Sequence, residues 1–185
     1  MEQVAAVDPH GHARGALSLR ARMGYAHCGQ VLVDFWPRQQ VLSEFCEEIT
    51  KDASCWLAIE SNNVVGFTLG YPIALAALEA KLRIPITVPF LGMFGSESRI
   101  AYQDEIGVVE AFRGRKIAKA LLVQRHEDFL RLGLTVGVVR TRKSPEPSVT
   151  YLWYTEKLGY QVIAEYKDGR VVLSRKLEGL REFLH

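Results

Sequence analysis

The chain has 185 residues, of which 48% are hydrophobic and 24% are charged, and its formal net charge is only +2. This length and composition suit a single globular domain with a sizeable core. The small net charge excludes a general surface for polyanions, and no stretch approaches the roughly 18 apolar residues of a membrane span.

The N-terminal part of the chain carries the weakest pattern. Residues 1–28 have no clean hydrophobic period, and His10 and His12 are typical of solvated side chains rather than metal ligands. Residues 30–35 predict a short strand. Pro37 opens a stretch with helical apolar spacing, which predicts an amphipathic helix. The apolar positions of this helix are Val41, Leu42, Phe45 and Ile49.

The cysteines and the N-terminus indicate in which cellular compartment the protein is expected. Cys28, Cys46 and Cys55 have no spacing typical of a metal site, and an odd number of cysteines without a framework favours reducing conditions. The start of the chain lacks the apolar run of a signal peptide. We therefore expect a cytoplasmic protein with no metal and no membrane association.

Two β-rich runs in residues 55–71 flank the turn-forming residues 61–63, which predicts a hairpin. A helix rich in Ala and Leu is expected over residues 73–83, followed by an irregular apolar segment over residues 85–95. The apolar insert, residues 72–98, has three interpretations: it lines an acceptor pocket, covers a homodimer seam or extends the core. The last two together are favoured.

The middle of the chain predicts a strand, a helix and a second strand. Residues 99–109 are typical of a strand, residues 115–132 of a helix ended by Gly133, and residues 134–141 of a buried central strand. Arg125 interrupts the apolar stripe of the helix, and we interpret it as a side chain that snorkels along the edge.

The last part of the chain predicts a helix and a hairpin. Pro147 precedes a helix through Leu158, which Gly159 ends, and residues 160–177 form the hairpin around a turn at residues 167–169. There is no internal repeat and no linker. Because strands and helices mix throughout, we predict one α/β or α+β domain over the whole chain.

Three cations crowd the turn between the strand 99–109 and the following helix: Arg113, Arg115 and Lys116. A helix N-terminus presents unpaired N–H groups and a partial positive charge, and Gly114 allows a close backbone approach. Together these features favour a phosphate site. The alternative is a solvated basic turn.

This turn resembles the acetyl-CoA motif of the GNAT acetyltransferase superfamily, (Gln/Arg)-x-x-Gly-x-(Gly/Ala). Arg113 and Ala118 match the motif, but Lys116 stands where the family usually has Gly. The N–H of Lys116 can still face a phosphate unless its backbone is left-handed. Residues 104–109, residues 154–162 and the first hairpin also resemble parts of the family, so the resemblance covers residues 55–177.

The resemblance implies a single GNAT-like domain. Its central sheet would be mixed and mostly antiparallel, with helices on both faces and a splay between the two central strands. Pantetheine would bind backbone groups that the splay releases, and the pyrophosphate would bind the amides of residues 115–118. The residues expected to bind acetyl-CoA are Val108, Val109, Arg113, Gly114, Arg115, Lys116, Ile117, Ala118 and Ser148.

Attack of an amine on a thioester needs a route for the amine proton. The candidate bases are Asp104 and Glu105, which strand alternation places on opposite faces of the sheet. We prefer Glu105, although a solvated carboxylate or a water relay would also agree with the sequence.

The leaving thiolate needs an acid, which in the family is a Tyr four residues before Gly. Here Thr155 stands four residues before Gly159, and a Thr hydroxyl cannot serve as an acid near neutrality. Tyr154 is our first candidate and Tyr151 the second. Both tyrosines are also explained by packing alone, in which case the thiolate leaves unassisted.

The resemblance thus implies an N-acetyltransferase that moves an acetyl group from acetyl-CoA to the amine of an unknown acceptor by direct attack. The alternative is a non-catalytic acyl-CoA-binding or sensor module, which Lys116 and Thr155 favour. A nucleic-acid-binding domain is disfavoured by the near-zero net charge.

Overall fold

The computed structural model describes residues 4–6, 52–61, 63–96 and 98–180. The predicted strand 30–35, the helix expected from Pro37 and the two histidines near the N-terminus lie outside these residues, as do Cys28 and Cys46. The short strand Val4–Ala6 was not predicted, and it adds to the edge of the sheet beside the first hairpin.

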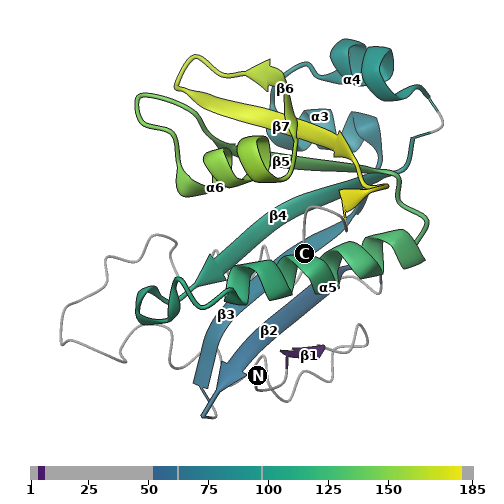
Figure 1. The fold of residues 1–185 in the computed structure, drawn as a ribbon. Coiled ribbons are helices and arrows are strands. Elements are labelled where there is room, and N and C mark those ends of the chain that lie inside the picture. Colours follow the sequence, from purple (N-terminus) through teal and green to yellow (C-terminus); the bar gives the residue numbers. More distant parts are fainter. Residues whose placement is uncertain (1–3, 7–51, 62, 97, 181–185) are drawn as a thin grey trace.

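The protein is built on one seven-stranded sheet with the order β1-β2-β3-β4-β5-β7-β6 (Figure 1). Every neighbouring pair is antiparallel except β4 and β5, which are parallel. Both predicted hairpins are confirmed, and the strand after the long helix is central as expected. The strands are β1 (Val4–Ala6), β2 (Ser54–Glu60), β3 (Asn63–Ile73), β4 (Ile100–Val108), β5 (Val136–Arg142), β6 (Gln161–Glu165) and β7 (Arg170–Lys176).

The two central strands separate after a short paired stretch. β4 and β5 pair only over Ile100–Tyr102 and Val136–Val138, yet β4 continues to Val108 and β5 to Arg142. Figure 1 shows the two strands diverging beyond this point. The edges of β4 and β5 that face each other there have no partner among the described strands, which confirms the expected splay.

Helices cover both faces of the sheet. Leu122 and Phe129 of α5 pack with Tyr154 in one core, and Leu78 and Phe90 of α3 and α4 pack in the other. The fold class is therefore confirmed. The helical elements are α3 (Leu75–Leu82), α4 (Thr87–Phe94), α5 (Ile117–Arg131), α6 (Val149–Leu152) and a π-helical turn that continues α6 (Trp153–Lys157).

The prediction of an irregular segment over residues 85–95 is wrong, because α4 occupies it. Pro89 is tolerated since it is the third helical residue, where a backbone N–H has no partner within the helix. The carboxylate of Glu79 caps α4 by accepting the N–H groups of Ile86 and Thr87, each at 2.8 Å. Ile86 is buried, so the insert extends the core.

Among the helices that the structure describes, none combines the length and apolar content needed to cross a bilayer.

Candidate active site

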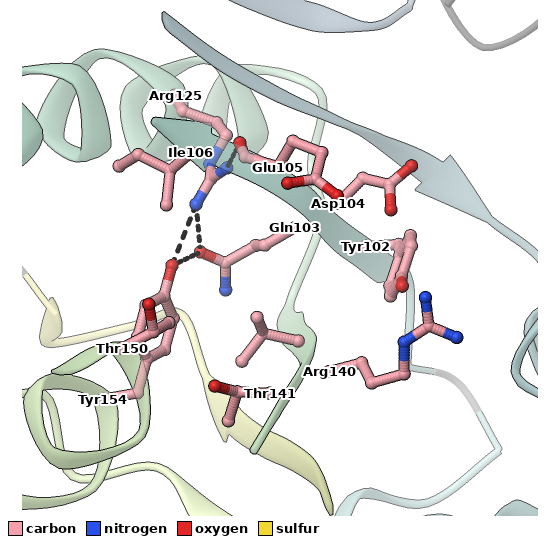
Figure 2. Close-up of a pocket in the computed structure, with 11 residues that line it drawn as sticks. Tyr102, Gln103, Asp104, Glu105, Ile106, Arg125, Arg140, Thr141, Thr150 and Tyr154 are labelled. Carbon is pink, nitrogen blue, oxygen red and sulfur yellow. Dashed lines mark hydrogen bonds between the residues drawn. The ribbon is translucent and has the colours of Figure 1, made fainter. Parts of the chain in front are cut away.

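The splay of β4 and β5 opens into a cavity of about 130 Å³ (Figure 2). Its walls come from five elements: β4, α5, β5, α6 and the π-helical turn. Polar and charged side chains from these elements converge on the cavity. The lining residues are Tyr102, Gln103, Asp104, Glu105, Ile106, Arg125, Val139, Arg140, Thr141, Thr150 and Tyr154.

Arg125 does not snorkel, so our interpretation of it was wrong. Its side chain is only 1% exposed and points from α5 toward the sheet, at the splay. Nη1 donates to the Thr68 hydroxyl at 2.6 Å and to the carbonyl oxygens of Leu69 and Glu105, each at 3.0 Å. Nη2 donates to Gln103 Oε1 at 2.8 Å and to the Tyr154 hydroxyl at 2.9 Å.

A signal for this burial was present in the sequence. Leu121, Arg125 and Phe129 are spaced four residues apart, which places Arg125 in the middle of the buried stripe rather than at its edge. The hydrogen-bond acceptors that allow an arginine there lie on β3, β4 and the π-helical turn. No local pattern in the sequence brings those acceptors together, so Gln103 was missed as well.

A β-bulge overturns the expectation that Asp104 and Glu105 lie on opposite faces of the sheet. Gly70 pairs with Gln103 and the preceding residue, Leu69, pairs with Glu105, so Asp104 is the extra residue. Tyr102 consequently packs in the core beneath α3 and α4, while Ile106 packs on the α5 face. Both carboxylates line the cavity, and Figure 2 shows them side by side on β4.

The two carboxylates differ in their surroundings. Asp104 accepts a 3.1 Å hydrogen bond from the Tyr71 hydroxyl and lies 3.5 Å from the Lys81 ammonium. The Lys81 ammonium also lies over the rings of Tyr71 and Tyr102. Asp104 is therefore already paired with a cation.

The π-helical turn brings Tyr154 to the cavity. Such a turn holds one residue more than an α-helical turn, and the N–H of Leu158 accordingly bonds to the carbonyl of Trp153 at 3.1 Å. Counting back from Gly159 therefore shifts by one residue, from Thr155 to Tyr154. The Thr155 hydroxyl is occupied elsewhere, because it donates to the Tyr151 carbonyl at 2.8 Å.

The phenol of Tyr154 is fully buried and lies at the centre of the polar network in Figure 2. It accepts from Arg125 and donates to Gln103 Oε1 at 3.1 Å. Burial raises the pKa of Tyr154, and the neighbouring Arg125 guanidinium opposes that rise. The phenol therefore carries its proton at neutral pH, as a proton donor must. Tyr151 is only half-buried, and no bond of its phenol is described.

The basic turn also has an unexpected backbone. α5 begins at Ile117, two residues later than predicted, because Lys116 adopts a left-handed conformation with φ 63°. By our own criterion, this takes the N–H of Lys116 out of the expected phosphate cradle. The first turn of α5 still begins without a side-chain cap, so the amides of Ile117 and Ala118 remain oriented outward at a helix N-terminus.

Gly114 and the three cations have distinct environments. Gly114 has φ 77°, and a Cβ placed on it would meet no atom within 4 Å, so the backbone is open there. Arg115 forms an ion pair with Glu60 and lies over the Phe112 ring, 5.3 Å from its centroid. Within the described part of the chain, neither Arg113 nor Lys116 has a carboxylate within 4 Å; their charges remain for an anion.

Three other predicted cofactor residues are constrained by bonds within the protein. The N–H of Val109 bonds to the Val65 carbonyl at 2.9 Å, so this N–H is not available to a ligand, whereas the side chain of Val109 is exposed. Val108 pairs with β3 on one edge and faces the splay with the other. The Ser148 hydroxyl caps α6 and bonds to Thr141.

The chain resembles solved structures in shape but not in sequence. No protein-family model and no curated protein sequence matches it. A Desulfovibrio desulfuricans protein assigned to the GNAT acetyltransferases superimposes with a TM-score of 0.54 and 15% identity, over 76% of this chain and 78% of that one. An N-acyl amino acid synthase from uncultured soil microbes gives a TM-score of 0.62 at 10% identity, over 98% of both chains. The NatC complex bound to a Gag peptide and CoA gives a TM-score of 0.56 at 12% identity, over 94% of this chain and 96% of that one.

The chain has a GNAT-like fold. The splay, the bulge in β4 and the helix that begins at the basic turn are the features of this fold that form the candidate site. Among the described residues, no cluster of His, Cys, Asp or Glu could hold a metal ion.

Proposed function

We propose that the protein is an acyl-CoA-dependent N-acyltransferase that moves an acetyl group from acetyl-CoA to an amine. The observation that carries this proposal is the cavity at the splay, where a carboxylate on β4 and a buried phenol on the π-helical turn face one space. Glu105 and Tyr154 are two groups that direct aminolysis of a thioester can use, as base and acid.

The cofactor would bind along α5. Its pyrophosphate would lie on the amides of Ile117 and Ala118, next to Gly114 and the charges of Arg113 and Lys116. A rise of 1.5 Å per residue separates Ile117 from Arg125 by about 12 Å along the helix. A ligand with phosphates at one end and a thioester at the other can therefore extend from the turn into the cavity, along the unpaired edge of β4.

The reaction needs one bond to form and one to break. The amine nitrogen attacks the thioester carbonyl carbon, a C–N bond forms and the C–S bond breaks. Glu105 takes the proton that the attacking amine loses, either directly or through a water molecule. Tyr154 gives its phenolic proton to the departing sulfur and is reprotonated from solvent. Arg125 holds the phenol oxygen in place at 2.9 Å throughout.

The structural neighbours agree with this proposal without fixing its details. The NatC structure holds CoA, and the soil enzyme is an N-acyl amino acid synthase. We propose a cytoplasmic enzyme whose partners are acetyl-CoA and an amine, with no nucleic acid or membrane, and a homodimer as its assembly.

A second candidate is a non-catalytic acyl-CoA-binding or sensor module. The left-handed Lys116 and the complete burial of the Tyr154 phenol favour this alternative. Transfer of radiolabelled acetyl groups to a panel of amines separates the two candidates. Labelled amide product supports the enzyme, whereas tight CoA binding without any product supports the sensor.

The proposal is tested first by isothermal titration with CoA. We expect binding that weakens as salt rises, because exposed cations meet the phosphates. No heat of binding at millimolar CoA would overturn both candidates.

A further inference from the structure

Arg125 is a buried positive charge that forms no ion pair with the described residues. Its side chain is 1% exposed, and in residues 4–6, 52–61, 63–96 and 98–180 no carboxylate lies within 4 Å of its guanidinium. A buried charge that has no counter-charge costs several kcal/mol, and proteins rarely keep one without a use. This charge lines the cavity where β4 and β5 part.

The hydrogen bonds of Arg125 do not remove that cost. All five acceptors of its terminal nitrogens are neutral: two hydroxyls, two backbone carbonyls and one amide oxygen. They occupy the donors of the two terminal nitrogens and fix the guanidinium in one orientation, while the buried Nε has no hydrogen-bond partner among the described residues. They leave the net charge in place, and in a poorly solvated site that charge attracts an anion more strongly than it would at the surface.

Neither acidic side chain of the cavity forms an ion pair with Arg125. Asp104 is held by Lys81 and Tyr71, and the Glu105 contact with Arg125 runs through its backbone carbonyl. Among the described residues the counter-charge is therefore missing, and a ligand that enters the cavity can supply it. The cavity holds about 130 Å³, which is about four times the share of one water molecule in the liquid. That volume suits a small group such as a carboxylate on a short chain.

We propose that the cavity at the splay binds a ligand carboxylate, which pairs with Arg125. The Thr150 hydroxyl lies on the same cavity and can donate to its oxygens. The carboxylate belongs either to the acyl group, as in a succinyl thioester, or to the amine acceptor, as in an amino acid. The first source rests on the proposed function, because it arrives on CoA.

The donor source is tested with succinyl-CoA and butyryl-CoA, which differ by a terminal carboxylate and have acyl chains of equal carbon number. We expect wild-type protein to bind succinyl-CoA at least about tenfold more tightly in titration calorimetry, as a charged hydrogen-bonded pair requires. CoA itself is titrated alongside. If CoA does not bind, the proposed function fails, and the donor comparison then says nothing against the acceptor source.

The acceptor source is tested with glycine and alanine against glycinamide and alaninamide, on the protein alone and on its CoA complex. Tighter binding of either acid than of its amide, by about tenfold, assigns the carboxylate to the acceptor. If succinyl-CoA binds no more tightly than butyryl-CoA and neither acid binds more tightly than its amide, the proposal is overturned. This comparison uses wild-type protein only, so it does not depend on a variant that folds.

A pair of variants assigns the preference to Arg125. Arg125→Met should abolish the tenfold preference for the carboxylate ligand, while Arg125→Lys should retain part of it. Arg131→Met is the matched control, because Arg131 lies on the same helix with a 73% exposed side chain. A preference that persists in a folded Arg125→Met protein would place the carboxylate elsewhere.

Discussion

Arg125 of α5 donates a 2.9 Å hydrogen bond to the phenol of Tyr154, and both side chains are almost completely excluded from solvent. This bond joins the two helical elements that flank the splay, and Gln103 of β4 completes the triangle by accepting from both. These two partners hold the phenol oxygen in position, and its proton reaches another acceptor only by leaving Gln103. The site therefore has a fixed proton donor before any ligand enters.

Protonation of Glu79 should lower the stability of the fold at acidic pH. Its pKa lies below the usual 4.5 because its carboxylate accepts from the Thr87 hydroxyl and from the N–H groups of Thr87 and Ile86. A lowered pKa means that the carboxylate stabilises the fold above pH 4.5 and that this contribution is lost as pH falls through the folded value. Glu79→Gln should therefore be less stable than wild type at pH 7, and the difference should shrink below pH 4.5.

Urea unfolding at pH 7, 5, 4 and 3 measures this difference. The control is Glu146→Gln, which removes an exposed carboxylate in the loop before α6. A difference between Glu79→Gln and wild type that stays constant across the series would show that the carboxylate charge does not stabilise the start of α4.

Gly114→Val should weaken CoA binding more than Arg115→Ala does. Gly114 has φ 77°, which a β-branched side chain adopts only with strain, and its open backbone is where a phosphate would approach. We expect a loss of at least about tenfold for Gly114→Val. Arg115 has a half-exposed side chain already paired with Glu60, so its removal should cost less than about tenfold.

The matched control for this comparison is Gly179→Val. Gly179 also has a positive φ, 74°, and open space around its Cβ direction, but it lies after β7. Calorimetry should show unchanged CoA affinity for this variant. Equal affinity for wild type and a folded Gly114→Val protein would exclude the turn as the phosphate site.

Lys116→Gly should stabilise the protein. A left-handed backbone costs a residue with a Cβ about 1–2 kcal/mol, which the substitution by glycine removes. Part of this stabilisation is lost again, because glycine has more conformational freedom in the unfolded chain. The net expectation is about 0.5–1 kcal/mol, or a rise in Tm of about 1–4 °C. Lys119→Gly, inside α5, should lower stability by about 1 kcal/mol instead. A lower Tm for both variants would contradict the strain at Lys116.

The sequence predicts most of the fold because its strand and helix periods are local. The turns of the two hairpins carry their own turn chemistry, and both hairpins were predicted correctly. The helix α4 was missed because its N-terminus depends on Glu79, seven residues before the first capped amide. A proline near a helix start looks the same in sequence as a proline in an irregular segment.

The candidate site is less predictable because it depends on departures from regular geometry. The bulge at Asp104 moves both carboxylates to the cavity. The π-helical turn places Tyr154, and not Thr155, one helical turn before Gly159. Each departure adds one residue to a regular element. Neither the alternation of side chains along a strand nor the four-residue spacing of a motif on a helix can reveal such an added residue. The roles of Glu105 and Tyr154, and of the residues expected to bind acetyl-CoA, stay predictions.

Tyr154 should be the residue whose loss slows acyl transfer most. Tyr154→Phe removes the phenolic proton and leaves Arg125 and Gln103 with one partner fewer, so we expect a loss of stability of about 1–3 kcal/mol. If Tyr154 protonates the leaving sulfur, turnover with acetyl-CoA and an accepted amine should fall by about tenfold to a hundredfold, with CoA affinity unchanged.

Two controls separate a lost acid from a damaged fold. Thr155→Ala removes a hydroxyl that donates to the Tyr151 carbonyl, and it should leave turnover within about twofold of wild type. Tyr151→Phe changes the half-buried phenol one turn earlier and should also have little effect. Turnover is compared below the lowest Tm of the set, at saturating CoA thioester. A rate for Tyr154→Phe equal to wild type would mean that the thiolate leaves unassisted or through water, and a slow Tyr151→Phe enzyme would move the assignment to Tyr151.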